Sequence, residues 1–460
     1  MSSSIVPPAR RARNPLITEA GYSLLQRITQ HPLAPKWNYE VGDRVIAADL
    51  QDVELFRAAL RAERSPGSIG PPPRIRDWIR SMHDRVTLFG ERLAEGFDLE
   101  RDWAYVPTMN REDIAVRIDK IVPAGVDLTR MIVYDTSGTT GHAIVVPYHP
   151  VTMAQNHPLL EYVLSRYGAS PKFDHDHVAC FNVGAQASTV VFPMVFSVWK
   201  QAGFAKVNLH PRCWAEVEQA RQFFEDLAPQ FITGDPVGFA EMIRWEIPIR
   251  PSAMVSTAVA LSAGLKARLE ASFGCPVIDY YSSTETGPIA YACPDGRGMC
   301  ILPHDIYVEI VDAEGFPVTE GERGEIAVTG GRNPYLPLLR YRTGDFGRFE
   351  KVPGGEAQPR IFDLEAREAV VFRAADGSAV SPVDIGRILR LYPVVMHELV
   401  QRGDGSCDLA IRPPAGAAVD EEEIKRRLET LFGAGSSVHV TIDENLGESG
   451  KSRPFRSELT

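Results

Sequence analysis

The sequence predicts an α/β protein of two domains, a large layered α/β N-terminal domain with a β subdomain and a small α+β C-terminal domain. The chain has 460 residues, which is more than one ordinary hydrophobic core organises. From residue 131 onward short β-rich runs alternate with helical patterns, as in layered α/β folds. A turn-rich stretch at 352–356 then separates the last part of the chain. We therefore expect domains at 1–362 and 363–460.

The elements follow this division along the chain. Residues 15 to about 120 alternate helical patterns with proline-rich breaks, which predicts a helical N-terminal segment. The next part has β-rich runs at 131–134, 178–181, 231–233 and 277–280. After Cys300 the expected strands lie closer together, at 306–311, 324–329 and 344–349, with a hairpin-like turn at 312–315. The last part reads β, α, β, α, β.

Composition and charge exclude several classes of function. The 49 Lys and Arg residues against 60 Asp and Glu give a net charge of −11, so nucleic acid and anionic membranes are not expected partners. The longest apolar stretch, 190–199, is too short to span a bilayer. The N-terminal arginines have no apolar run behind them, and the six cysteines contain no C-x-x-C pair, which favours a reducing, cytoplasmic location. Small molecules are the expected ligands.

A glycine-rich turn follows the first β run. Its backbone N–H groups and hydroxyls suit a phosphate chain, and its residues are Thr136, Ser137, Gly138, Thr139, Thr140 and Gly141. The turn is not a Walker A loop, because only two residues separate its glycines and His142 stands in place of the lysine. An ordinary polar hairpin turn is the structural alternative.

Four segments in order along the chain carry a family resemblance. They are 136–141, Tyr280 to Gly287 (YYSSTETG), Leu339 to Asp345 (LRYRTGD) and Gly447 to Arg453 (GESGKSR). They resemble the motifs of the adenylate-forming superfamily, which includes acyl-CoA and aryl-CoA ligases. The segments 229–236 and 333–340 resemble the phenylacetate-CoA ligase branch more narrowly.

The resemblance implies a role for each matching residue. It implies an AMP-forming acid–thiol ligase that uses ATP, Mg²⁺ and coenzyme A, with a small domain that rotates between two half-reactions. Residues 136–141 would hold the phosphates. The other implied roles are Thr284 at the α-phosphate, Glu285 on Mg²⁺, Tyr281 against adenine, Asp345 and Arg367 on the ribose, and Lys451 as the catalytic cation.

The expected acid pocket lies beside the nucleotide loop. Its walls are expected from Phe181, Gly184, Ala185 and Tyr280, and the two small residues leave room for a flat ring. The resemblance to the phenylacetate-CoA ligase branch makes an aromatic carboxylate the first expected substrate, and a medium aliphatic or amino-acid-like acid is the alternative.

Several alternatives stay open. The acceptor thiol is coenzyme A or the phosphopantetheine of an acyl carrier protein, and a homodimer is possible. Ala369 replaces the family's hinge aspartate, which leaves thioester formation open, and His142 stands where lysine is common. These two departures are the support for a nucleotide-binding pseudoenzyme or sensor.

A cluster of possible zinc ligands remains. Cys293, Cys300 and His304 have the side chains that bind zinc, as do His210 and Cys213. The phenylacetate-ligase branch includes zinc-carrying members, but the spacing is loose and favours buried structural cysteines.

Overall fold

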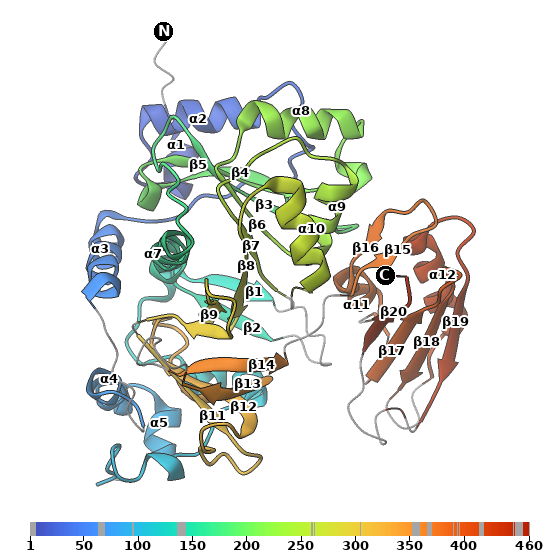
Figure 1. Ribbon diagram of the computed structural model, residues 1–460. Coiled ribbons are helices and arrows are strands. Elements are labelled where there is room, and N and C mark those ends of the chain that lie inside the picture. Colours follow the sequence, from blue (N-terminus) through green and yellow to red (C-terminus); the bar gives the residue numbers. More distant parts are fainter. Residues whose placement is uncertain are drawn as a thin grey trace.

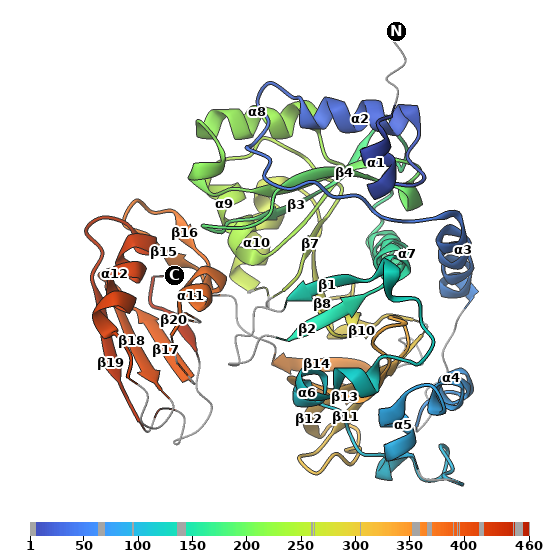
Figure 2. The same ribbon diagram turned by 180° about the vertical axis from the view of Figure 1, so that it is seen from behind.

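We describe the protein from a computed structural model (Figure 1). The structure describes residues 6–62, 70–93, 96–135, 144–258, 261, 263–303, 305–351, 359–365, 370–389, 391–392, 394, 396–413, 418–444, 446 and 454–459. In Figures 1 and 2 the residues from 370 onward form a smaller body beside the rest, as the predicted two-domain α/β architecture requires.

The first part of the chain is helical, as the proline-rich breaks predict. Its helices are α1 (Pro8–Arg13), α2 (Glu19–Thr29), α3 (Ala47–Ala62), α4 (Pro73–His83), α5 (Thr87–Arg92), η1 (Trp103–Tyr105), α6 (Arg111–Ile121) and η2 (Leu128–Arg130). Pro73 is the first residue of α4, where its missing N–H breaks no helical hydrogen bond.

One twelve-stranded sheet organises the large domain. Its strand order is β11-β12-β13-β14-β10-β9-β8-β7-β6-β3-β5-β4. The strands of its parallel part are β3 (Val178–Gly184), β5 (Ala202–Asn208), β6 (Phe231–Gly234), β7 (Met254–Ser256) and β8 (Val277–Ser283), with β4 (Phe192–Phe196) antiparallel at the edge. The carboxyl ends of parallel strands lie at one edge of a sheet, where α/β proteins bind ligands.

Helices cover both faces of the parallel part, so its strands are buried on two sides. The helices α2, α8 (Val217–Leu227), α9 (Pro236–Arg244) and α10 (Ala263–Phe273) share one core with the sheet, whereas α3 and α7 (Pro150–Arg166) share the other. The short helices η3 (Ser197–Trp199) and η4 (Pro211–Cys213) lie in connections.

The predicted β subdomain is the antiparallel part of the same sheet. Its strands are β9 (Gly287–Ala292), β10 (Met299–Ile301), β11 (Ile306–Val311), β12 (Arg323–Gly330), β13 (Leu338–Glu350) and β14 (Arg360–Glu365). A separate hairpin, β1 (Ile132–Asp135) and β2 (Val145–Tyr148), flanks residues 136–144.

The small domain has its own core. Its elements are β15 (Phe372–Arg373), β16 (Ala379–Val380), α11 (Pro382–Leu389), β17 (Met396–Gln401), β18 (Cys407–Arg412), α12 (Glu421–Phe432), β19 (Val438–Ile442) and β20 (Phe455–Ser457). The order contains the predicted β, α, β, α, β series as β16, α11, β17, α12 and β19, and adds β15, β18 and β20. The predicted boundary at 362/363 lies inside β14, which pairs with the large sheet up to residue 365.

The two domains touch through polar and apolar contacts. Ala187 donates its backbone N–H to Asp384 of α11 over 2.7 Å, and Arg373 of β15 is 3.0 Å from the buried Glu241 of α9. Ala185, Val237 and Ala379 form a small apolar cluster between the domains. Within the described residues, no helix is both long and apolar enough to cross a membrane.

Candidate active site at the carboxyl ends of the strands

A tight turn after β8 presents the predicted phosphate and metal residues. Thr286 donates its backbone N–H to Ser283 Oγ over 3.1 Å, and the Tyr148 hydroxyl donates to the Thr284 carbonyl. Gly287 has φ +69°, a conformation that side chains disfavour. The turn therefore holds Thr284 and Glu285 in place at the strand end.

An arginine from the helical segment contacts Glu285. Arg111 Nη1 lies 2.5 Å from Glu285 Oε1, and the Glu285 side chain is 7% exposed. The Tyr341 hydroxyl is also hydrogen-bonded to Glu285. Asn110 and Asp113 form a capping box at the start of α6, which fixes the helical turn that carries Arg111. Glu285 thus lies between the Arg111 guanidinium and the Tyr341 hydroxyl.

The second and third motifs meet in space. The Tyr281 hydroxyl donates to Asp345 Oδ2 over 2.9 Å and lies 3.3 Å from Thr343 Oγ1. Burial and the Asp345 charge raise the pKa of Tyr281 well above its ordinary value, so the phenol stays protonated and remains the donor. The predicted contact of Tyr281 with adenine stays a prediction.

A buried ion pair anchors the strand that carries Asp345. Arg340 is fully buried, lies 2.9 Å from Glu309 Oε1, and donates to the backbone carbonyls of Val106 and Gly315. Burial raises the pKa of Glu309, and the Arg340 charge opposes that rise. Because removing one partner would leave a buried charge, this pair fixes β13 against β11, and the bond to the Val106 carbonyl ties β13 to the helical segment.

The predicted acid-pocket residues do not all lie together. Phe181 packs against Phe223 and Phe224 of α8, whereas Tyr280 belongs to the core on the opposite face of the sheet. The Tyr280 hydroxyl is buried without a hydrogen-bond partner in the described part of the chain. Phe181 and Tyr280 therefore cannot line one pocket, and we leave Phe181 out of the site.

Gly184 and Ala185 lie where β3 meets the small domain. A Cβ on Gly184 would lie 3.8 Å from Asp235 Oδ2 and would meet no other heavy atom within 4 Å. Ala185 is 2% exposed and packs against Val237 and Ala379. Among the described residues a carboxylate therefore borders Gly184, and the place of Gly184 and Ala185 in an acid pocket stays a prediction.

Some predicted residues lie outside the described part of the chain. They are Thr136, Ser137, Gly138, Thr139, Thr140, Gly141, Arg367 and Lys451, together with His142, His304 and Ala369. Their roles stay predictions. The strands on both sides of the loop pair with each other, with Asp135 opposite Val145.

One residue at the site was not found by sequence reasoning. Arg111 reaches Glu285 across 174 positions. It has no local sequence signal, because the pairing of distant elements brings it to the site.

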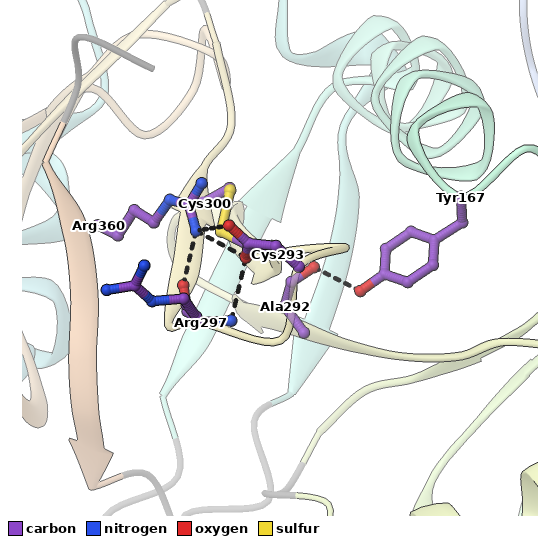
Figure 3. The surroundings of a disulfide bond; sticks show 7 residues. Tyr167, Ala292, Cys293, Arg297, Cys300 and Arg360 are labelled. Atoms are coloured by element: carbon purple, nitrogen blue, oxygen red, sulfur yellow. Dashed lines mark hydrogen bonds and ion pairs between the residues drawn. A yellow bond between two sulfur atoms is a disulfide. The ribbon is translucent and has the colours of Figure 1, made fainter. Parts of the chain in front are cut away.

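Two of the six cysteines form a disulfide bond. Cys293 and Cys300 are bonded to each other at the β9–β10 hairpin (Figure 3). The sequence favoured a reducing compartment over a disulfide framework and did not predict this bond. Because both sulfurs are used in this bond, they are not zinc thiolates, and no cluster of three metal-binding side chains occurs among the described residues. Cys180, Cys213, Cys275 and Cys407 are free.

An ion pair holds the hairpin that carries the disulfide. Arg360 of β14 contacts both oxygens of Asp295 at 2.7 Å and donates to the Arg297 carbonyl over 2.9 Å (Figure 3). The Tyr167 hydroxyl donates to the Ala292 carbonyl over 2.7 Å. The hairpin is thereby fixed between β14 and α7.

The turn after β8 supplies one carboxylate, that of Glu285, which could bind a magnesium ion. Mg²⁺ is usually bound by one or two carboxylates together with substrate phosphates, and Glu285 supplies such a carboxylate beside the hydroxyl of Thr284. Its contact with Arg111 already balances the carboxylate charge. A metal at this position would share Glu285 with Arg111.

Comparison with known proteins adds sequence evidence. A family model described as AMP-binding enzyme matches residues 116–333. Protein CapK of Staphylococcus aureus is 21% identical over 350 residues, which cover 73% of this chain and 75% of CapK. Phenylacetate-coenzyme A ligases of Aromatoleum evansii and Escherichia coli are 26% and 27% identical over 50% of this chain. These matches cover 58% and 53% of the two ligases, little more than half their length.

Solved structures share the fold. A 2-hydroxyisobutyryl-CoA ligase in complex with 2-HIB-AMP and CoA matches with a TM-score of 0.56 and 19% identity, over 92% of this chain and 97% of that chain. The same ligase in its postadenylation state matches with a TM-score of 0.51 and 18% identity, over 84% of this chain and 88% of that chain. These structures show the fold. The AMP-binding enzyme family model and the matches to phenylacetate-coenzyme A ligases, together with the motifs after β8 and in β13, support the assignment of the chain to the adenylate-forming superfamily, on a branch similar to phenylacetate-coenzyme A ligase.

Proposed function

We propose that this protein is an ATP-dependent acid–thiol ligase. A substrate carboxylate attacks the α-phosphorus of ATP, pyrophosphate leaves, and an acyl-adenylate forms. A thiol then attacks the acyl carbon, which gives a thioester and releases AMP. The contact between Tyr281 and Asp345 supports this proposal most, because it unites two motifs that the family uses for one nucleotide.

Asp345 is the proposed ribose acceptor. Tyr281 occupies Oδ2, and the proposed ribose contact uses the remaining acceptor capacity of the carboxylate. The tyrosine therefore orients the carboxylate as well as lying near the nucleotide. Arg367 is proposed as a second ribose contact.

Thr284 and Glu285 are the proposed groups at the reacting phosphate. The turn after β8 fixes both, and the Arg111 guanidinium holds the Glu285 carboxylate in an ion pair. Mg²⁺ bound to Glu285 would neutralise phosphate charge. Lys451 and residues 136–141 are proposed as the further cation and the phosphate loop, on the resemblance alone.

The proposed substrate is an aromatic carboxylic acid, and the proposed acceptor is coenzyme A. The matches to phenylacetate-coenzyme A ligases support both choices. Tyr280 and Gly184 remain as proposed pocket residues, since Phe181 belongs to the opposite core.

Pyrophosphate release in the presence of ATP, Mg²⁺ and a panel of aryl and aliphatic acids tests the proposal. We expect release that depends on one class of acid and is lost in Lys451→Ala, with AMP and acyl-CoA formed only when coenzyme A is added. Lys425→Ala is the matched control, because Lys425 lies on α12 of the same domain and its ammonium contacts only the exposed Glu422 among the described residues. Binding of ATP without pyrophosphate release for any acid would contradict the ligase proposal and favour a nucleotide sensor.

A further inference from the structure

Glu285 already has a cationic partner, although the proposed function assigns its carboxylate to Mg²⁺. Arg111 Nη1 lies 2.5 Å from Glu285 Oε1, which is a short, charge-assisted contact. A Mg²⁺ ion lies about 2.1 Å from a carboxylate oxygen that binds it. Two cations at such distances from one carboxylate repel each other, so each should weaken the binding of the other.

The arginine is the more accessible partner of this pair. The Arg111 side chain is 28% exposed, whereas that of Glu285 is 7% exposed. In the pair of Arg340 and Glu309 the two side chains are 1% and 4% exposed, and Arg340 also donates to backbone carbonyls. Loss of its contact would therefore leave the Arg111 guanidinium near water, whereas the guanidinium of Arg340 would remain buried.

The backbone that carries Arg111 is fixed. Met109 donates its N–H to the Arg340 carbonyl over 3.1 Å, and the Met109 carbonyl accepts from Arg342 N–H over 2.8 Å. Asn110 caps α6, of which Arg111 is the first residue, and α6 packs against β13 (Figure 2). A change of partner by Arg111 therefore needs rotation of its side chain and no movement of the helix.

Glu285 is fixed near the proposed ribose acceptor. Thr286 N–H donates to Ser283 Oγ in the turn after β8, and the Tyr341 hydroxyl is hydrogen-bonded to the Glu285 carboxylate. Tyr341 lies on β13, four residues before Asp345. Four residues of an extended strand span at most about 13 Å, so the phosphates of a nucleotide whose ribose lies on Asp345 can reach Glu285. A metal ion that accompanies these phosphates would meet Glu285 with its arginine partner in place.

We propose that Arg111 competes with Mg²⁺ for Glu285: it pairs with the carboxylate in the nucleotide-free protein and gives it up when ATP and Mg²⁺ bind. This inference rests on the proposed ligase function, which supplies the nucleotide and the metal. Without the arginine, the nucleotide-free protein would hold a buried carboxylate that no cation balances, which is unfavourable. Because coupling free energies are reciprocal, removal of Arg111 should strengthen metal binding by the same factor by which the metal weakens the arginine contact.

Two other roles of Arg111 make different predictions. If the pair with Glu285 is structural only and the metal binds elsewhere, removal of Arg111 changes stability but not the dependence of nucleotide binding on Mg²⁺. If Arg111 only contacts the phosphates, its removal weakens nucleotide binding equally with and without the metal. The ratio of the two nucleotide affinities, with and without Mg²⁺, rises only when Arg111 and the metal compete.

Binding of an ATP analogue tests the proposal without turnover. We would measure the dissociation constant of α,β-methylene ATP by calorimetry in EDTA and in saturating Mg²⁺, and divide the first constant by the second. The ratio should exceed one in the wild type and should rise about tenfold in Arg111→Gln. Arg111→Lys retains a positive charge, should give an intermediate ratio, and decides the question if Arg111→Gln does not fold. In the Glu285→Gln background, Arg111→Gln should leave the ratio unchanged.

Arg92→Gln is the matched control. Arg92 lies 2.8 Å from Asp113 of α6, so its loss loosens the same helix without touching Glu285 and should leave the ratio unchanged. An unchanged or smaller ratio in Arg111→Gln, an equal rise in Arg92→Gln, or wild-type binding that Mg²⁺ does not strengthen would overturn the competition.

The ligase function is tested separately by pyrophosphate release. A protein that shows the expected ratios but releases pyrophosphate with no acid would contradict the ligase function and leave the competition at Glu285 supported. A protein that does not bind the analogue at all would overturn both proposals.

Discussion

The hydroxyl of Tyr281, at the end of β8, donates to Oδ2 of Asp345 in β13 over 2.9 Å. We expect Tyr281→Phe to raise KM for ATP about tenfold, since a hydrogen bond to a charged group is lost. KM for the acid should stay the same, because the phenol contacts the proposed ribose acceptor. Steady-state kinetics with ATP and the acid varied in turn would measure both constants. An equal rise in the two would contradict the assignment of Asp345 to the nucleotide.

Because Arg111 and Glu285 form an ion pair, we expect substitutions of the two residues to have non-additive effects on stability. Arg111→Ala should lower the free energy of unfolding by about 2 kcal/mol, less than for a fully buried pair because Arg111 is partly exposed. The double variant with Glu285→Gln should lose less than the sum of the two single variants, because no unpaired carboxylate remains. Urea denaturation of the four proteins gives the coupling, and additive losses would count against the pair.

The disulfide predicts a thiol count and a stability change. Denaturing alkylation without reductant should label four cysteines, and prior reduction should raise the count to six, as measured by mass spectrometry. Cys293→Ser combined with Cys300→Ser should cost about 2 kcal/mol of unfolding free energy, because the closed loop is short. Six labelled thiols in the unreduced protein would disprove the bond.

His157 predicts a loss of stability in mild acid. Its ring packs 4.3 Å from both Phe196 and Trp199, and burial lowers the pKa of the imidazole to about 4. The unfolded chain therefore binds a proton between about pH 6.5 and 4 that the folded protein does not, so stability falls as the pH drops through this window. The loss of unfolding free energy between pH 7 and pH 4.5 should be about 2 kcal/mol smaller in His157→Leu than in the wild type, as denaturation at the two pH values would measure. The same pH dependence in both proteins would show that His157 does not cause it.

Loss of the domain contact at Glu241 should make the protein less compact. Glu241 is 1% exposed and pairs with Arg373 of the small domain and Arg244 of its own helix. We expect Arg373→Met to weaken the contact and to increase the radius of gyration measured by small-angle X-ray scattering. Arg402→Met is the matched control, because Arg402 pairs with Asp408 and Glu458 inside the small domain. Equal scattering from all three proteins would argue against Arg373 as a domain contact.

Local signals in the sequence predicted the elements and the motif positions. The turn after β8 and the strand with Asp345 lie where the sequence places them, because turn residues and β-rich runs are short-range features. The contact of Arg111 with Glu285 spans 174 positions and depends on the packing of α6 against β13. Nothing local in the sequence encodes that packing.

The misplacement of Phe181 has a different cause. A parallel strand buried on both faces is apolar at nearly every position, so the alternation that marks an inner and an outer face is missing. The pairing of β3 with β5 also shifts between Val178 and Cys180. Which side chains of β3 face α7 is therefore decided by tertiary pairing.

The position of β14 has a consequence for folding. β14 inserts between β10 and β13, both of which come earlier in the chain. A growing chain that ends before residue 360 therefore leaves two strand edges without a partner at the centre of the sheet, and such edges promote aggregation. Truncations just before β14 should be insoluble, whereas those after residue 365 should allow the large sheet to form. During synthesis the edges of β10 and β13 are thus open to aggregation until the six residues of β14 (Arg360–Glu365) are made. Chaperones would have most effect at this stage.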